Sequence, residues 1–274
     1  MKYDQLFIHP SARRLLDAYL DSPTHALLIS GARGSGSGTL ARAIAQASVD
    51  HDADIYLVEP DEKGTITIEA IRELYVWTRD KKTKPQVVLI DGADQMSHDA
   101  QHAFLKLLEE PNDLTRFVLT AHYASRLLPT IFSRLQHIEL RPVSLSLSQK
   151  LVDSLVQNDA QKTKQILFLA QGLPAEVSRI ATNAEYFAMR SALAADARIL
   201  MSGSTYDRLE VISRYKDRNE ALELIGVLSQ MLVFMLEKKT DEQIDRLAKT
   251  AERTAAAIRA NGHVRTQLMR LALR

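Results

Sequence analysis

Apolar positions divide the chain into a first part with short apolar runs and a last part with helical spacing. The short runs occupy residues 26–30, 55–58, 87–90, 117–120 and 138–140. The middle runs are rich in Val, Ile and Leu without alternation, which is typical of a parallel sheet covered on both faces. Helical spacing connects the runs, so the pattern predicts an α/β fold with a five-stranded parallel sheet.

The clearest helical segment covers residues 97–110. Its apolar side chains recur at the i, i+3, i+4, i+7 and i+8 positions that form one helix face. Ser97 is a good N-cap residue, and Pro111 ends the pattern. The segment therefore predicts one amphipathic helix packed on the sheet.

The pattern changes after Pro142. Residues 143–184 read as short helices, and all eight prolines lie at or before Pro174, so the last third is helical throughout. Residues 219–238 are apolar around most of the helix circumference, which predicts burial inside a bundle or at a subunit interface. We predict an α/β domain over 1–141, a helical lid domain over 142–184 and a helical collar domain over 185–274.

Composition narrows the class of protein. The 274 residues carry a net charge of +1, which argues against a surface that binds nucleic acid throughout, although a local basic patch stays open. Cysteine is absent, which excludes disulfides and thiolate metal sites. No uninterrupted apolar run approaches the ~18 residues of a membrane span. We expect a cytoplasmic protein without a membrane segment or a bound metal.

Residues 27–40 follow the order strand, glycine loop, helix. This order lets backbone N–H groups converge on phosphates at a helix N-terminus. The pattern G-x-x-x-x-G-K-[ST] aligns Gly31 and Gly36 but puts Ser37 at the lysine and Gly38 at the hydroxyl. Either the loop binds phosphate weakly or not at all, or it is a glycine-rich turn without a ligand.

A second motif follows the apolar run at 87–90, where Asp91 stands at the expected carboxyl end of a strand. Open parallel sheets bind ligands at that edge. The degenerate nucleotide site would therefore comprise Gly31, Gly34, Gly36, Ser37, Gly38, Thr39 and Asp91.

Residues 86–141 carry a family resemblance. The runs VVLIDGADQMSHDAQHAFLKLLEEP and TRFVLTAHYASRLLPTIFSRLQHIEL resemble the Walker-B strand, L-x-x-L-E-E-P helix, sensor-1 strand and S-R-C motif of the AAA+ clamp-loader family. Ser133 and Arg134 match the last motif, Leu135 replaces its cysteine, and Thr120 falls in the sensor-1 region. The resemblance covers nearly the whole chain and is weakest over 185–255.

The chain lacks residues that the catalytic members of that family carry, and in this it resembles the delta-prime-type subunits. Gly92 stands where catalytic members carry the glutamate that polarises water, and losing a general base costs roughly 10²–10⁴ in rate. Ala175 stands where they carry the sensor-2 arginine. The four-cysteine zinc module of bacterial relatives is absent. The resemblance implies that this chain binds no cofactor and hydrolyses no ATP, although its enzyme status stays open.

By the same resemblance, Arg134 and its neighbour Ser133 serve the ATP and Mg²⁺ of an adjacent subunit. An arginine finger of this kind can contribute about 10³–10⁵ in rate. The alternative from spacing alone is a surface arginine in a local salt bridge.

The resemblance implies a non-catalytic subunit of the DNA polymerase III clamp loader, within a DNA polymerase holoenzyme. Its partners would be the other clamp-loader subunits, joined through the collar, the sliding clamp, and primer-template DNA. The alternatives are an AAA+ ATPase motor with a variant P-loop and an AAA+-derived adaptor outside replication.

Two other polar features are better explained as solvated side chains than as binding sites. His98 and His102 share a helix face without an evident third metal ligand, so we expect solvated histidines. The lysines at 81–84 could contact DNA phosphates but fit a solvated loop better.

Overall fold

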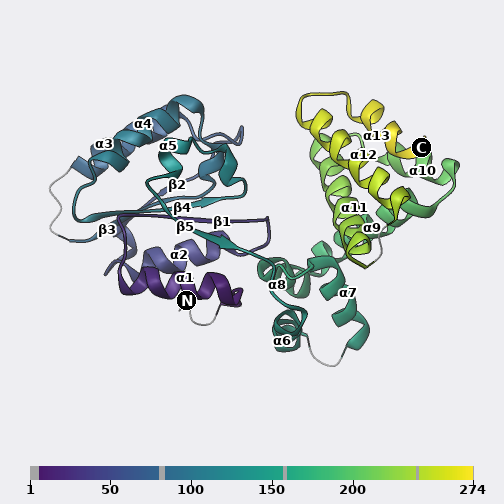
Figure 1. The fold of residues 1–274 in the computed structure, drawn as a ribbon, viewed down its shortest axis with the longest axis horizontal. Coiled ribbons are helices and arrows are strands. Elements are labelled where there is room, and N and C mark those ends of the chain that lie inside the picture. Colours follow the sequence, from purple (N-terminus) through teal and green to yellow (C-terminus); the bar gives the residue numbers. More distant parts are fainter. Residues whose placement is uncertain (1–5, 80–83, 157–158, 239–240, 274) are drawn as a thin grey trace. The chain divides into compact units, whose positions relative to one another are not determined.

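A computed structural model describes residues 6–79, 84–156, 159–238 and 241–273 (Figure 1). The chain forms two compact units, one up to Thr182 and one from Asn183 onward. Three of the predicted basic-loop residues, 81–83, lie outside the described residues.

All five predicted strands are confirmed, and they form a single parallel sheet in the order β2-β3-β4-β1-β5. After β1 the chain crosses to the edge strand β2, returns through β3 to β4 beside β1, and then adds β5 on the other side of β1. All carboxyl ends therefore meet at one edge of the sheet. The strands are β1 (Ala26–Gly31), β2 (Ile55–Val58), β3 (Gln86–Ile90), β4 (Thr115–Ala121) and β5 (Gln136–Leu140).

Helices cover both faces of this sheet, as the unalternating strands predict (Figure 1). One face packs against α1 (Pro10–Asp21) and α2 (Ser37–Ala47), the other against α3 (Ile68–Arg79), α4 (His98–Glu109) and α5 (Pro129–Phe132). Successive residues of β1 supply the two cores: Leu28 faces α3 and α4, whereas Leu27 and Ile29 face α1 and α2. Three short 3-10 turns complete this domain: η2 (Asp52–Asp54), η3 (Ala93–Gln95) and η4 (Ala124–Arg126).

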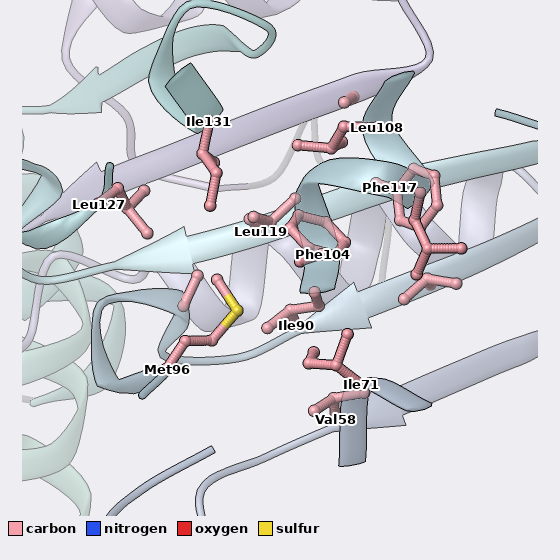
Figure 2. Close-up of a cluster of buried hydrophobic side chains, with 14 of the residues drawn as sticks. Val58, Ile71, Ile90, Met96, Phe104, Leu108, Phe117, Leu119, Leu127 and Ile131 are labelled. Atoms are coloured by element: carbon pink, nitrogen blue, oxygen red, sulfur yellow. The ribbon is translucent and has the colours of Figure 1, made fainter. Parts of the chain in front are cut away.

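Phe104 and Phe117 anchor α4 on the sheet (Figure 2). Both rings are buried, and they meet edge to face with centroids 5.4 Å apart. The helix starts as predicted, because the Ser97 side chain accepts a hydrogen bond from the Ala100 N–H at 3.2 Å. The packing and the cap together determine where the last residue of α4, Glu109, lies.

Three helices follow the sheet within the first unit: α6 (Leu145–Leu155), α7 (Ala160–Ala170) and α8 (Pro174–Thr182). They contact one another and form the helical segment predicted after Pro142. Gly172 turns the chain between α7 and α8 with a φ of +77°, and its carbonyl accepts the Val143 N–H at 2.8 Å. The contacts within the chain place these helices in one unit with the sheet, up to Thr182. A separate lid domain therefore stays a prediction.

The second unit is entirely helical where it is described. Its central helix α11 packs against α9 and α12 and buries one set of apolar side chains: Ala221, Leu224, Ile225, Val227, Leu228, Met231 and Leu232. The end of α11 exposes Val233, Phe234 and Met235. The helices are α9 (Ala184–Ser202), α10 (Thr205–Arg214), α11 (Arg218–Lys238), α12 (Glu242–Arg259) and α13 (Val264–Ala272).

By length and composition alone, α11 is the one described helix apolar enough to cross a membrane. Glu220 and Glu223 interrupt its apolar sequence. Its packing between α9 and α12 is the usual setting of a core helix, which meets the same criterion.

Candidate functional site

The glycine loop joins β1 to α2 and has the backbone that a phosphate loop requires. Gly34 and Gly36 have φ values of +87° and +91°, which side chains with a Cβ rarely adopt. Gly36 is the N-cap of α2, so Ser37, Gly38 and Thr39 form the first helical turn. The predicted strand, loop and helix are therefore present in the expected order.

Asp91 follows β3 and faces this first turn. A Cβ atom added at Gly38 would lie 3.4 Å from Asp91 Oδ2. A hydroxyl side chain at position 38 would thus point at the carboxylate, which is how a P-loop and a Walker-B acid share a Mg²⁺ ion. The structure brings the predicted loop and acid together but leaves no hydroxyl between them.

Thr120 holds Asp91 from the neighbouring strand β4. Its hydroxyl donates to Asp91 Oδ1 at 2.6 Å and accepts the Gly92 N–H at 2.8 Å. Thr120 is buried, so neither bond competes with bulk water. The predicted sensor-1 residue therefore orients the acid.

Arg42 supplies a positive charge that the sequence analysis missed. Its guanidinium lies 3.6 Å from Asp91 Oδ2 and 2.8 Å from Glu59 Oε1. The available signal was helical spacing, because Arg42 follows Gly38 by four residues and so lies on the same face of α2. Asp91 is thus hydrogen-bonded on one oxygen and paired with a cation on the other.

The helix α8 contacts the glycine loop directly. The Gly34 carbonyl accepts the N–H groups of Ala175 at 2.9 Å and Glu176 at 3.2 Å. Such first-turn N–H groups have no partner inside their own helix. A Cβ atom added at Gly34 would lie 2.9 Å from Glu176 Cβ, so this approach also requires glycine. Ala175, at the predicted sensor-2 position, therefore lies beside the loop.

Two further residues at this edge escaped the sequence analysis. The buried Asp94 carboxylate accepts the backbone N–H groups of His122 at 3.1 Å and Tyr123 at 3.2 Å. His122 Nδ1 donates to the Gly31 carbonyl at 3.1 Å. Asp94 follows Asp91 in the run DGAD, which was the one local signal for it. These bonds tie the end of β4 to the start of the loop.

The second predicted site lies at the other edge of the sheet. Arg134 stands two residues before β5 begins, whereas the glycine loop follows the end of β1. Because β1 and β5 are parallel, with Leu27 opposite Gln136 and Gly31 opposite Leu140, these positions lie at opposite strand ends. From Leu27 to Gly31 there are four steps of about 3.3 Å, or roughly 13 Å.

Buried Gln101, also missed from the sequence, holds the segment that leads to Arg134. Its Nε2 donates to the Met96 carbonyl at 3.3 Å and the Arg126 carbonyl at 3.2 Å, and its Oε1 accepts the Leu128 N–H at 2.8 Å. The predicted Ser133 hydroxyl donates to the Thr130 carbonyl at 3.1 Å. Ser133 therefore stabilises the turn after α5.

Arg134 itself contacts two elements. Its Nη1 donates to the Thr130 carbonyl and its Nη2 to Glu109 Oε1, each at 2.8 Å. The side chain is 37% exposed and that of Glu109 is 49% exposed. The local salt bridge considered from the sequence is thus present, and a guanidinium edge still faces solvent.

His137 lies in β5 between the two edges and contacts β1 and α5. Its Nε2 is hydrogen-bonded to the Ser30 hydroxyl at 2.7 Å, and its ring packs edge to face on Phe132, with centroids 5.1 Å apart. Burial lowers the pKa of His137, and nearby Glu139 opposes that shift. The ring is therefore held neutral near physiological pH.

No group of three His, Asp or Glu side chains placed to hold a metal occurs among the described residues. The rings of His98 and His102 meet edge to face with centroids 4.5 Å apart, and both residues are exposed. Their exposure fits two solvated histidine side chains.

Comparisons with known proteins agree with this architecture. Residues 50–144 match the family model of the DNA polymerase III delta subunit. The chain is 35% identical over 125 residues to a replication factor C small subunit of Aeropyrum pernix, a match covering 43% of this chain and 38% of that protein. It is 33% identical over 131 residues to DNA polymerase III subunit delta' of Pseudomonas aeruginosa, covering 46% and 40%. The chain therefore matches well under two thirds of these relatives' length.

A solved DNA polymerase III gamma subunit-related protein from Thermotoga maritima has the same fold. It aligns with a TM-score of 0.60 at 18% identity, over 96% of this chain and 97% of its own. The RuvB branch-migration motor of the same organism aligns with a TM-score of 0.52 at 17% identity, over 66% of this chain and 62% of its own.

The sheet order, the glycine loop facing Asp91, and α8 on that loop define a P-loop α/β protein of the AAA+ type. Sequence matches to replication factor C and DNA polymerase III subunits narrow the class further. In sequence and fold the chain is thus similar to the clamp-loader family of AAA+ proteins.

Proposed function

We propose that this chain is a non-catalytic, delta-prime-like clamp-loader subunit that presents Arg134 to ATP bound by a neighbouring subunit. The observation that carries the proposal is the position of Arg134 at the opposite edge of the sheet from its own loop. The strand length of roughly 13 Å between the two edges exceeds the length of an arginine side chain. Arg134 therefore does not reach a phosphate at its own loop, which supports a role at a site on a neighbouring chain.

The chain's own loop is a poor fit for Mg²⁺-ATP. Ser37 provides no cation for the phosphates, and Gly38 provides no hydroxyl for the metal. Arg42 already pairs with the Asp91 oxygen that faces position 38. Bringing Mg²⁺ there would place two cations on one carboxylate oxygen. A lone phosphate could still meet backbone N–H groups of the loop.

Arg134 has the properties that an arginine finger needs. Its guanidinium is permanently charged and presents planar donors that match phosphate oxygens. It is partly exposed, and Gln101 and Ser133 hold the turn that carries it. In this proposal it stabilises charge on the γ-phosphoryl group that water attacks in the neighbouring site.

The helical unit supports a role in assembly. Val233, Phe234 and Met235 are exposed at the end of α11, and exposed apolar side chains of this kind are available for subunit contacts. The proposed partners are the other clamp-loader subunits, and the assembled complex would load the sliding clamp onto primer-template DNA with ATP hydrolysis.

The test is ATP turnover in a clamp loader reconstituted from the same source with the Arg134→Ala variant. The site facing this chain should lose about 10³-fold in rate, so total turnover should fall by that site's share, and clamp loading should fall with it. Arg134→Lys should rescue poorly because it keeps the charge but loses the planar donors. Arg141→Ala, which removes another exposed, paired arginine, is the matched control.

Two results would contradict the proposal. Unchanged turnover and loading in the assembled Arg134→Ala complex would remove the active role of this chain. Saturable binding of a fluorescent ATP analogue to the isolated chain, with turnover abolished by Asp91→Asn, would indicate a motor subunit instead.

A further inference from the structure

Glu109 is the one described side chain that forms an ion pair with Arg134. It is the last residue of α4, and its Oε1 accepts the Arg134 Nη2 hydrogen bond at 2.8 Å. Arg134 belongs to the turn after α5, so the ion pair connects the ends of two helices. The proposed finger is therefore held from both sides, by α4 through Glu109 and by α5 through the Thr130 carbonyl.

A carboxylate at this position is electrostatically unfavourable for the helix. The C-terminal end of a helix carries partial negative charge, and an acidic side chain there costs a few tenths of a kcal/mol or more. Glu110 follows as the C-cap, so α4 ends with two acids in succession. Helix stability therefore does not explain Glu109, whereas a cation to be held does.

The contact leaves most of the guanidinium available. A guanidinium has five N–H donors, and the two bonds to Glu109 and Thr130 use one donor on each terminal nitrogen. The Arg134 guanidinium makes no other hydrogen bond to described residues. Three donors therefore stay free for phosphate oxygens while two bonds restrict rotation of the group.

We propose that Glu109 is a positioning residue. It orients Arg134 so that the free donors face the neighbouring nucleotide while the ion pair between Glu109 and Arg134 stays intact. This inference rests on the proposed function of Arg134. Geometry of this kind affects catalysis more than binding, because prior orientation removes rotational freedom that the transition state would otherwise have to restrict. ATP itself is held by the neighbour, so its apparent affinity should change little.

The first measurement uses the isolated chain and needs no partner. Guanidinium ¹H–¹⁵N NMR reports rotation about the Arg134 Nε–Cζ bond, with Arg134→Lys identifying the signal. Glu109→Gln should speed this rotation, whereas Glu110→Gln, which neutralises the adjacent exposed carboxylate, should not. Equal rotation rates in both variants and the wild type would overturn the inference, since Glu109 would not hold the group.

The second measurement is ATP turnover in the reconstituted complex. Glu109→Gln should lower maximal turnover at the facing site by about tenfold, which is less than Arg134→Ala, with the KM for ATP nearly unchanged. The double variant should be no slower than Arg134→Ala alone, because residues acting as one unit are not additive.

The outcomes separate this inference from the proposed function. If Arg134→Ala lowers turnover but Glu109→Gln leaves it unchanged, raises it, or adds to the arginine effect, the positioning role is wrong and the finger stands. A rise in turnover would mean that Glu109 competes with phosphate for Arg134. If Arg134→Ala itself has no effect, the proposed function is wrong and the positioning role falls with it.

Discussion

The two edges of the sheet differ in how fully their charged groups are bonded within the chain. At the carboxyl edge, Asp91 is bonded to Thr120 and paired with Arg42, and the Gly34 carbonyl is bonded to α8. At the amino edge, Arg134 is held by two bonds and keeps three donors. Asp91 and the Gly34 carbonyl are thus bonded within the chain, whereas Arg134 keeps donors available to a partner.

The glycines of the loop at the carboxyl edge have a structural role of their own. Gly34 and Gly36 allow left-handed backbone, and Gly34 leaves room for Glu176. Those requirements come from packing α8 on the loop and hold with or without phosphate. Residues that contact only nucleotide, such as the P-loop lysine, have no comparable structural role and can be lost.

Removing a large side chain from the core of the sheet should have the largest effect on the free energy of unfolding. Phe104→Ala removes a fully buried ring from the contact with Phe117 and should lower the free energy of unfolding by about 3–5 kcal/mol. Urea denaturation measures this change, with Leu15→Ala, at a 47% exposed position, as the control. Equal effects of the two variants would mean that α4 is not anchored through this ring.

Gly34→Ala should affect the carboxyl edge alone. The new Cβ would meet Glu176 Cβ at 2.9 Å in left-handed backbone, so we expect a cost of about 2–3 kcal/mol and faster amide exchange at Ala175 and Glu176. The control is Gly64→Ala, where φ is also positive at +76° but the nearest atom, Gln95 Oε1, is 3.8 Å away. Its cost should be about 1 kcal/mol. If the two substitutions cost the same, the contact with α8 contributes nothing.

Thr120→Val tests whether Asp91 is oriented by its neighbour. Valine keeps the volume but loses the hydroxyl, which leaves the Gly92 N–H and one Asp91 oxygen without that partner. We expect a loss of about 1–3 kcal/mol in the free energy of unfolding. Thr130→Val, at an exposed threonine near Arg134, should change stability by less than about 0.5 kcal/mol. A neutral Thr120→Val would show that the carboxyl edge is not satisfied internally.

The smallest effect should be a pH dependence from His137, between the two edges. Burial holds its pKa below the ordinary value of 6.5, so the unfolded chain binds a proton more readily than the folded one. The free energy of unfolding should therefore fall as the pH drops below about 6.5 and level off below the folded-state pKa. Comparing His137→Gln with the wild type from pH 7.5 to 5 isolates this contribution. Parallel curves for the two proteins would contradict it.

Several elements of the fold were predictable because their signals are local. Unalternating Val, Ile and Leu marked β3 and β4, and Ser97 with the apolar stripe marked α4. The glycine spacing predicted the loop that follows β1. Each of these depends on residues adjacent in sequence or one helical turn apart.

The site was predictable only in part. Asp91 was predicted from its place after an apolar run, and Thr120, Ser133 and Arg134 from the family resemblance, whereas Arg42, Asp94, Gln101 and His122 were missed. The missed side chains are ordinary polar residues on helices and turns, and their partners lie 17 or more residues away, apart from the bond of Gln101 to Met96. A one-dimensional pattern does not report which polar groups meet across such separations.

The sequence by itself thus determined the layered α/β architecture, the left-handed glycine loop, and the absence of a lysine and a metal-binding hydroxyl in that loop. Tertiary structure alone decided that Arg42 pairs with Asp91, that α8 bonds to Gly34, and that Glu109 holds Arg134. The physical reason is range. Backbone conformation and apolar periodicity are properties of neighbouring residues, whereas these contacts form only once the parallel strands bring distant carboxylates, cations and carbonyls to a shared edge.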